Sequence, residues 1–347
     1  MPRMAVLASP NTGSYPTFER EIRPLLNSSA QIFLTSNRAE LIGVVDQLHQ
    51  LKPDIIVIAG GDGAMHVCLT AIADRYQRDR TEIPSILMLA LGTMNDGATA
   101  LGVDRPVSLL KRVNRKLARG DGLETRLFRP MTVNGECAFL YGAGLPVAFL
   151  QRYYRDKPPG AIGGPIGGGM TIGTAIWSEI LIELGLADNR GWLQRLLSIL
   201  GLREATGLLN SLLAEFGQLD AQEWEEKNIN IRIHSSFGAT DEQFRTYTGL
   251  MATVIDQIGL GLRAFRDAMK HGSSFTLRTT ELSLTEILVA GPAILTSLRV
   301  PGINDTVHKE AIIEYRQPTV RMIDGDLKEP AMSDTLGMGP TLEIITG

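Results

Sequence analysis

Short apolar runs alternate with longer amphipathic stretches along the first third of the chain. Residues 54–59 (DIIVIA) and 86–91 (ILMLAL) are largely apolar runs, and a glycine follows each of them. Such runs are typical of strands that are covered on both faces. Residues 38–51 carry apolar side chains at helical spacing, and further helices are predicted at 65–76 and 107–119. This strand–helix alternation predicts an α/β domain with a parallel sheet and helices on both faces.

The pattern changes after Gly120, Asp121 and Gly122. From Arg126 onward strand-like segments dominate, and several alternate in polarity, as residues 229–233 (INIRI) do. A period of two is typical of an antiparallel sheet with one face in water. We therefore expect an α/β domain at residues 1–122 and a mainly antiparallel β-sandwich domain at residues 123–347.

A glycine-rich and apolar stretch interrupts the second domain. Residues 158–169 read PPGAIGGPIGGG, and residues 170–219 are rich in Ile, Leu and Gly with few charges. We expect a helical apolar insertion near 158–219. It would either pack against the sheet as core or act as a cover or surface-seeking segment over an apolar ligand.

Composition narrows the class of protein. At roughly 100–200 residues per domain, 347 residues suggest two domains. The formal net charge of −4 argues against a nucleic-acid binder, which normally has a basic excess. Two cysteines exclude a disulfide framework. Because no uninterrupted apolar window reaches 18 residues and no secretory signal is recognisable, we expect a cytoplasmic protein without a membrane span.

The strongest local signal is Gly60-Gly61-Asp62-Gly63, between the run at 54–59 and a predicted helix. Glycines at such a junction let the chain turn sharply and let a ligand approach the backbone. The following helix offers unpaired N–H groups and the positive end of its dipole, which suit a phosphate. Asp62 would orient a metal or a hydroxyl, or simply cap the helix.

A second glycine turn follows the next apolar run, in residues 91–97 (LGTMNDG). Hydroxyl, amide and carboxylate groups gather there at the end of a predicted strand. In open α/β sheets, ligands bind outside the carboxyl ends of the strands. Two polar glycine turns on neighbouring strand ends would therefore face one crevice.

A third signal, Asp324-Gly325-Asp326, follows an alternating strand near the C-terminus. Asp-Gly is common in hairpin turns, so the local pattern favours a hairpin. The two carboxylates would alternatively hold Mg²⁺ or accept a proton.

Taken in order, the three motifs resemble the superfamily of diacylglycerol, sphingosine and ceramide kinases. In that family a nucleotide-binding α/β domain precedes a β-sandwich, and ATP and the lipid meet in the cleft between them. The resemblance implies that residues 1–122 bind the nucleotide and residues 123–347 the lipid. It also implies ATP and Mg²⁺ as cofactors.

The resemblance further implies three sets of site residues. The nucleotide-binding set comprises Gly60, Gly61, Gly63, Gly92, Thr93 and Asn95. The metal-holding residue is Asp96. The candidate catalytic carboxylates are Asp62, Asp324 and Asp326, and either Asp62 or Asp324 would accept the proton of the lipid hydroxyl.

The sequence departs from the family pattern at several of these positions. Ala64 stands where the family has Thr, Val67 where it has Glu, and Asp326 where it has Glu. His66 resembles the Met-His pair of sphingosine-kinase-like members. The changes at Ala64 and Val67 leave open a catalytically impaired homologue that only binds nucleotide or lipid. An NAD kinase also shares the GGDG turn, but the second motif and the apolar residues 170–219 argue against it.

The leading hypothesis is an ATP-dependent lipid kinase that transfers the γ-phosphoryl group to a hydroxyl of diacylglycerol, ceramide or a sphingoid base. Its partners would be a lipid acceptor and a peripheral membrane surface, not nucleic acid. The membrane contact would come from residues 170–219 or from the basic residues 111–119. Because the net charge of −4 disfavours purely electrostatic attraction, we expect the apolar residues 170–219 to dominate. The sequence leaves the acceptor lipid and the oligomeric state open.

Overall fold

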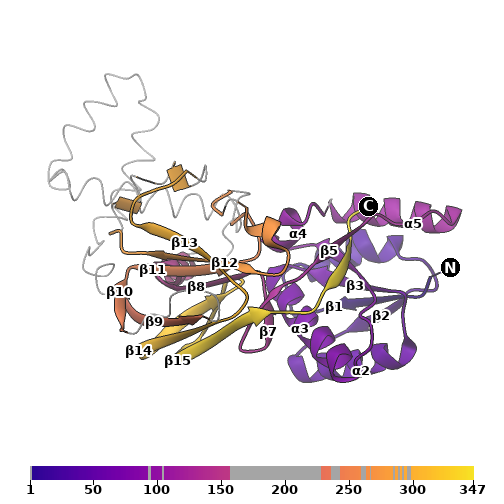
Figure 1. The fold of residues 1–347 in the computed structure, drawn as a ribbon. Helices are drawn as coiled ribbons and strands as arrows, with labels where there is room; N and C mark the ends of the chain where they lie inside the picture. The colour runs from indigo at the N-terminus through magenta and orange to yellow at the C-terminus, as the bar shows by residue number, and fades with distance from the viewer. Residues whose placement is uncertain are drawn as a thin grey trace, which may run out of the picture.

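The structure is a computed structural model (Figure 1). It describes residues 2–92, 95–103, 105–156, 228–235, 243–258, 263–265, 267–283, 286–287, 290, 293–294 and 298–347. The expected apolar insertion near 158–219 and the site residue Thr93 lie outside the described residues.

Six of the described strands form the first sheet. Their order is β2 (Gln31–Leu34), β1 (Met4–Ala8), β3 (Ile55–Gly60), β4 (Ser85–Ala90), β16 (Leu342–Ile345) and β5 (Thr125–Phe128). All neighbours pair in parallel except β16 and β5, which pair antiparallel. The predicted parallel sheet is therefore confirmed.

Helices cover both faces of this sheet. Leu7 and its face of β1 pack in one core with α2 (Arg38–Leu51) and α3 (Asp62–Arg78). Val6 and the opposite face pack with α5 (Pro106–Arg119) and with the helical turns α1 (Tyr15–Thr17), η1 (Phe18–Ile22) and η2 (Arg23–Leu25). Because both faces are covered, β3 is buried at every position, as its apolar run predicts.

Two strands beyond residue 122 belong to the first sheet, which corrects their expected placement in the second domain. The chain leaves the first sheet after β5 and returns to it at β16. The two strands pair with each other from Phe128↔Leu342 to Thr125↔Ile345. The chain between them builds the second sheet. The second domain is therefore an insertion between two neighbouring strands of the first, which holds the two sheets together at this edge.

The second sheet is mainly antiparallel, as predicted. Its strands are β6 (Met131–Val133), β7 (Glu136–Ala138), β8 (Leu140–Gly144), β9 (Ile229–Ser235), β10 (Arg245–Tyr247), β11 (Gly249–Thr253), β12 (Phe275–Thr280), β13 (Ile303–His308), β14 (Ala311–Ile323) and β15 (Asp326–Met338). The path runs β13-β12-β11-β8-β14-β15-β6-β7, with β9 and β10 attached beside β14. α6 (Leu145–Asp156) follows β8, and the 3₁₀ turn η3 (Ala268–His271) precedes β12.

The described strands of the second domain are linked by hydrogen bonds into one connected network. β14 changes partner along its length, because residues 311–315 pair with β9 and residues 321–323 with β8. Register shifts between Glu314 and Arg321 accompany the change. Pro318, which has no N–H to donate to a ladder, lies between these two segments.

The turn between β14 and β15 is a two-residue hairpin. Ile323 pairs with Asp326, and Asp324 and Gly325 between them have φ values of +48° and +86°. Positive φ at both central residues is the type I′ geometry that favours Asp-Gly. The hairpin interpretation is confirmed, and the Asp324 N–H donates to the Leu140 carbonyl (2.9 Å), which docks the turn on β8.

One hydrophobic core runs from the first sheet into the second. Phe128 at the end of β5 stacks on Phe139, with 5.6 Å between ring centroids. Both rings belong to the core that also contains residues of α2 and α3. Within the described ranges, no helix is long and apolar enough to cross a membrane.

Candidate active site

The two glycine turns touch each other. β3 and β4 pair as far as Gly60 and Ala90, and the Leu91 N–H donates to the Gly60 carbonyl (3.0 Å). A Cβ on Gly61 would lie 2.9 Å from the Gly92 Cα, and a Cβ on Gly92 would overlap the Gly61 Cα. No side chain fits at either position, so the two turn backbones pack directly against each other.

α3 begins directly from the first turn. Gly61 is its extended N-cap (φ −91°, ψ −173°) and offers no side-chain cap. Met65 N is bonded to the Gly61 carbonyl (3.0 Å), and the N–H groups ahead of Met65 have no carbonyl partner inside the helix. These donors, at the positive end of a 17-residue helix, suit a phosphate. The helix starts three residues before its predicted start, so Asp62 and Gly63 belong to its first turn.

Asn95 closes the second turn. Its side-chain oxygen accepts from the Gly92 N–H (2.9 Å) and its amide nitrogen donates to the Gly92 carbonyl (2.7 Å). Asn95 itself adopts φ +55°, in the left-handed region. Both ends of the amide therefore hold Gly92, and the expected contact of Asn95 with a nucleotide stays a prediction.

Asp62 reaches from the first turn to the start of α4 (Asp96–Ala100), a short helix that the sequence did not predict. Its carboxylate accepts N–H groups of Asp96 (3.0 Å) and Gly97 (3.2 Å). Burial and the nearby negative charge of Asp96 raise the pKa of Asp62 to about 6, with a smaller contribution from Asp324. Asp62 thus caps α4 and is also a carboxylate poised near neutral pH.

Asp324 is turned into the protein. Its side chain is only 2% exposed and accepts the N–H groups of Phe139 (3.0 Å) and Leu140 (2.8 Å). Burial raises the pKa of Asp324, and its contact with His66 opposes that rise. The carboxylate oxygens face main-chain donors and an imidazole rather than open space.

Asp326, two residues on, is exposed. A Cβ on Gly63 would lie 3.5 Å from its Oδ2 atom. The hairpin of the second sheet therefore brings a solvent-accessible carboxylate over the first glycine turn, which lies some 260 residues earlier in the sequence.

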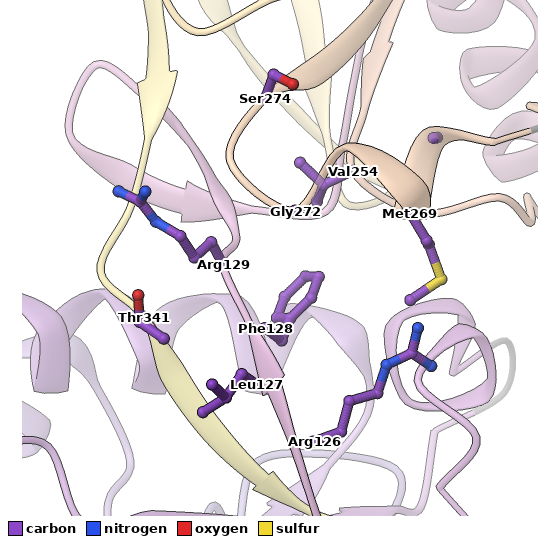
Figure 2. A pocket seen from close by; sticks show the side chains of 10 residues that line it. Arg126, Leu127, Phe128, Arg129, Val254, Met269, Gly272, Ser274 and Thr341 are labelled. Carbon is purple, nitrogen blue, oxygen red and sulfur yellow. The ribbon is translucent and has the colours of Figure 1, made fainter.

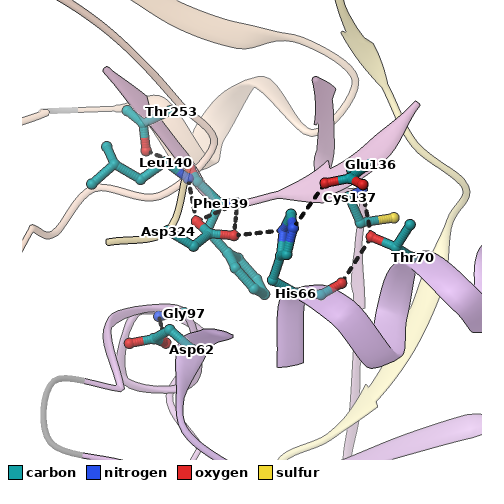
Figure 3. Close-up of polar contacts among 10 residues, drawn as sticks. All are labelled: Asp62, His66, Thr70, Gly97, Glu136, Cys137, Phe139, Leu140, Thr253 and Asp324. Carbon is teal, nitrogen blue, oxygen red and sulfur yellow. Dashed lines mark hydrogen bonds and ion pairs between the residues drawn. The ribbon is translucent and has the colours of Figure 1, made fainter. Parts of the chain in front are cut away.

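Figure 3 shows a cluster of polar side chains that connects the first domain to the second sheet beside these carboxylates. His66 lies between Asp324 and Glu136, and the Thr70 hydroxyl accepts the Cys137 N–H (2.9 Å). The motifs did not identify Glu136, because it lies in a short strand without a recognisable pattern. His66 follows Asp62 by four residues on α3, a spacing that places the two on one helix face.

The two departures from the family pattern on α3 occupy different environments. A Cβ on Gly60 would lie 2.5 Å from the Cβ of Ala64, so a hydroxyl at position 64 would stand beside the turn. Val67 is half-buried and packs against the main core. Only the change at Ala64 therefore removes a polar group next to the glycine backbone.

The carboxylates at the two glycine turns, Asp62 and Asp96, fit Mg²⁺ chemistry. Among the described residues, no three His, Cys, Asp or Glu side chains form a preassembled metal cluster. Mg²⁺ is commonly held by one or two carboxylates together with substrate phosphates and waters, so no such cluster is required. Asp96, whose negative charge acts on Asp62, is the carboxylate at the second turn that suits this role.

A pocket of about 280 Å³ lies beyond the Phe128–Phe139 pair, between β5 and η3 (Figure 2). It is lined by Arg126, Leu127, Phe128, Arg129, Val254, Ala268, Met269, Gly272, Ser274 and Thr341. None of the residues singled out from the sequence motifs lines it. It is therefore separate from the glycine turns, although its lining residue Phe128 stacks on Phe139, which lies against Gly97.

Comparison with known proteins identifies the class of this domain. Residues 3–123 match the family model described as the diacylglycerol kinase catalytic domain. Within these residues the chain is similar to the catalytic domain of diacylglycerol kinases. A curated relative, "Probable lipid kinase YegS" of Escherichia fergusonii, is 32% identical over 107 residues. That match covers 31% of this chain and 33% of the relative, so the chain aligns with about a third of the relative's length.

Solved structures extend the likeness in fold to the whole chain. A diacylglycerol kinase from Bacillus anthracis str. Sterne gives a TM-score of 0.59 at 13% identity and covers 99% of this chain and 97% of its own. Another crystal structure from the same organism, with the same coverage, gives a TM-score of 0.63 at 12% identity. At these identities the likeness shows the two-domain fold alone.

The contact between the glycine turns predicts the effect of Gly92→Ala. The added methyl group would force the turns apart, and we expect a loss of about 1–3 kcal/mol in the free energy of unfolding. Gly43→Ala in α2 is the control, because nothing lies within 4 Å of its Cβ position. Alanine is more stable than glycine inside a helix, so this variant should gain about 0.5–1 kcal/mol in the free energy of unfolding. Denaturant unfolding measures both. An unchanged Gly92→Ala midpoint would mean that the turns are not in contact.

The raised pKa of Asp62 predicts a pH-dependent stability. Because it lies above the ordinary value of about 3.9, the neutral acid favours the folded state. That contribution is complete below about pH 4 and is lost as the pH rises through about 6. Relative to Asp62→Asn, the wild type should therefore lose on the order of 2–3 kcal/mol between pH 4 and pH 8. Unfolding without Mg²⁺ at both pH values measures this, and parallel profiles would contradict it.

Proposed function

We propose that the protein is an ATP-dependent lipid kinase that transfers the γ-phosphoryl group of ATP to the hydroxyl of a lipid. The observation that carries the proposal is the contact of Gly61 with Gly92, which joins both glycine turns at one edge of the parallel sheet. Asp62 and Asp326 lie at the same edge. The diacylglycerol kinase catalytic domain in residues 3–123 supports this chemistry.

The first step is to position the phosphates. Phosphoryl transfer depends mainly on alignment and on neutralising charge. The N–H groups at the start of α3, beside the touching turns at Gly61 and Gly92, would donate to the phosphates. When bound through Asp96, Mg²⁺ would offset the charge of the transferred group.

Asp62 is the better candidate to accept the proton of the lipid hydroxyl. Asp324 was an equal candidate by sequence, but its carboxylate is buried against main-chain donors and His66. Asp62 has a pKa of about 6, close to the range in which a general base works at neutral pH. Asp326 supplies a second accessible carboxylate over the first turn.

The acceptor class in this proposal is diacylglycerol, ceramide or a sphingoid base. Because such acceptors reside in bilayers, the enzyme would work in the cytoplasm at the membrane surface. The apolar residues 170–219 that were expected to mediate this contact lie outside the described residues. In the basic stretch on α5, Lys116 pairs with Glu124 (2.8 Å), which reduces the charge available to anionic headgroups.

The direct test is transfer of labelled γ-phosphate from ATP with Mg²⁺ to a panel of the three lipid types, with NAD as a further acceptor. We expect transfer to at least one lipid and none to NAD. Asp62→Asn should reduce turnover by about 10²–10⁴-fold, the range for a positioned proton acceptor. Asp305→Asn, in an ion pair on β13 away from the turns, should retain turnover.

Two results would contradict the proposal. One is a folded sample that binds ATP but phosphorylates no lipid. The other concerns Asp62 alone: if Asp62→Asn loses folded protein in proportion to activity, the carboxylate only caps α4.

The second candidate function, a homologue that binds nucleotide or lipid without turnover, is favoured by Ala64. Its methyl group stands beside Gly60, where the family pattern has a hydroxyl. If this loss limits activity, Ala64→Thr should raise turnover by about tenfold, the effect of one added hydrogen bond of 1–1.5 kcal/mol. Steady-state kinetics of wild type and variant decide this. Ready turnover by the wild type with no gain in Ala64→Thr would exclude the impaired homologue.

A further inference from the structure

The imidazole of His66 is enclosed between two carboxylates. The side chain is 2% exposed; its Nδ1 lies 3.4 Å from Asp324 Oδ2 and its Nε2 lies 3.3 Å from Glu136 Oε2 (Figure 3). The Nδ1 contact is an ion-pair approach, because its geometry does not complete a hydrogen bond. Both ring nitrogens therefore face an acceptor.

The three side chains come from both parts of the fold. His66 lies on α3, which covers the first sheet, whereas Glu136 lies on β7 and Asp324 in the β14–β15 turn of the second. The ring thus connects the helix that begins at the glycine turn to the hairpin that carries Asp326. Glu136 is held in turn by Arg38 of α2, whose Nη1 donates to its Oε1 (2.7 Å).

The surroundings of His66 favour its positively charged form. A neutral imidazole carries an N–H on one nitrogen only, so one carboxylate would face a lone pair, whereas an imidazolium presents an N–H and a positive charge to both. Burial alone would lower the pKa of His66, and Lys328 acts in the same direction. Asp324 and Glu136 outweigh both, so the pKa lies above the ordinary value. Asp62, one helical turn away, adds a further negative charge near Asp324.

We propose that His66 is a positioning residue whose imidazolium clamps the second sheet to α3 and so keeps the Asp326 carboxylate over the first glycine turn. Its action runs through Asp324, which it holds at the docked hairpin tip. The catalytic consequence rests on the proposed kinase function, whereas the clamp itself does not.

Loss of the charge should release the hairpin rather than the nucleotide. Asp324 would then be a buried carboxylate without its cationic partner, an arrangement that favours movement of the tip toward water. The glycine turns belong to the first sheet, so ATP binding should persist. For His66→Asn we therefore expect kcat to fall about 10–100-fold, the effect of a misplacement near 1 Å, with the KM for ATP changed less than threefold.

The first experiment observes the charge directly and needs no turnover. The full-length protein is labelled with ¹⁵N-histidine, and its 5 histidines are followed from pH 5 to pH 9, with His66 assigned by its loss in His66→Asn. His66 should stay doubly protonated at neutral pH, and Glu136→Gln should move its midpoint to lower pH. His49→Asn is the matched control, because His49 has its own carboxylate, Asp79, at 3.6 Å at the C-terminal end of α3, and its loss should leave the His66 midpoint unchanged. A neutral His66 at pH 7, or a midpoint indifferent to Glu136→Gln, overturns the clamp.

The second experiment measures pH–rate profiles of lipid phosphorylation. The clamp is present below the pKa of His66 and lost above it, so wild-type kcat should decline on the alkaline side. Glu136→Gln, which keeps His66 and a folded core, should move that decline to lower pH, while His49→Asn should leave it in place. An unshifted alkaline limb in Glu136→Gln overturns the positioning role.

The two experiments separate the inference from the proposed function. A charged, Glu136-dependent His66 in a protein that phosphorylates no lipid would refute the kinase proposal and leave the clamp standing. A neutral His66 in an active kinase would refute the clamp and leave the kinase proposal standing.

Discussion

The close contact of Gly61 with Gly92 is the constraint on which the site depends. Two neighbouring parallel strands end in turns whose backbones touch, so neither position can carry a side chain. That contact sets where α3 begins and where the second turn leads into α4. Because the starts of α3 and α4 are brought so close, the Asp62 carboxylate of α3 can accept the first N–H groups of α4.

The insertion of the second sheet between β5 and β16 supplies the remaining groups. Since both strands lie in the first sheet, the inserted domain is tied at its two ends to one edge, and its β14–β15 hairpin meets α3 there. Burying the Asp324 carboxylate at this junction would be costly without partners. Two main-chain N–H groups and the His66 imidazole offset that cost. The junction is thus held by polar contacts as well as by the Phe128–Phe139 stack.

The local part of this architecture was accessible from the sequence. The apolar runs at 54–59 and 86–91 mark covered strands, the glycines mark their ends, and Asp-Gly marks the hairpin. Long-range pairing was not accessible. No pattern indicates that residues 342–345 return to the first sheet, because a short apolar strand reads the same in either sheet. Likewise nothing local links His66 to Glu136, 70 residues away, or shows that Asp324 faces inward.

The hairpin turn explains why two carboxylates only two residues apart take different roles. Asp324 and Gly325 both adopt positive φ, which reverses the chain within two residues and directs the Asp324 side chain onto the Phe139 and Leu140 N–H groups. Asp326 begins the outgoing strand and projects into solvent near Gly63. The Asp324 side chain is 2% exposed and is held by fixed donors, so it orients its neighbours. The Asp326 side chain is exposed beside the first glycine turn. One tight turn therefore separates a group that fixes geometry from a group that is free to react.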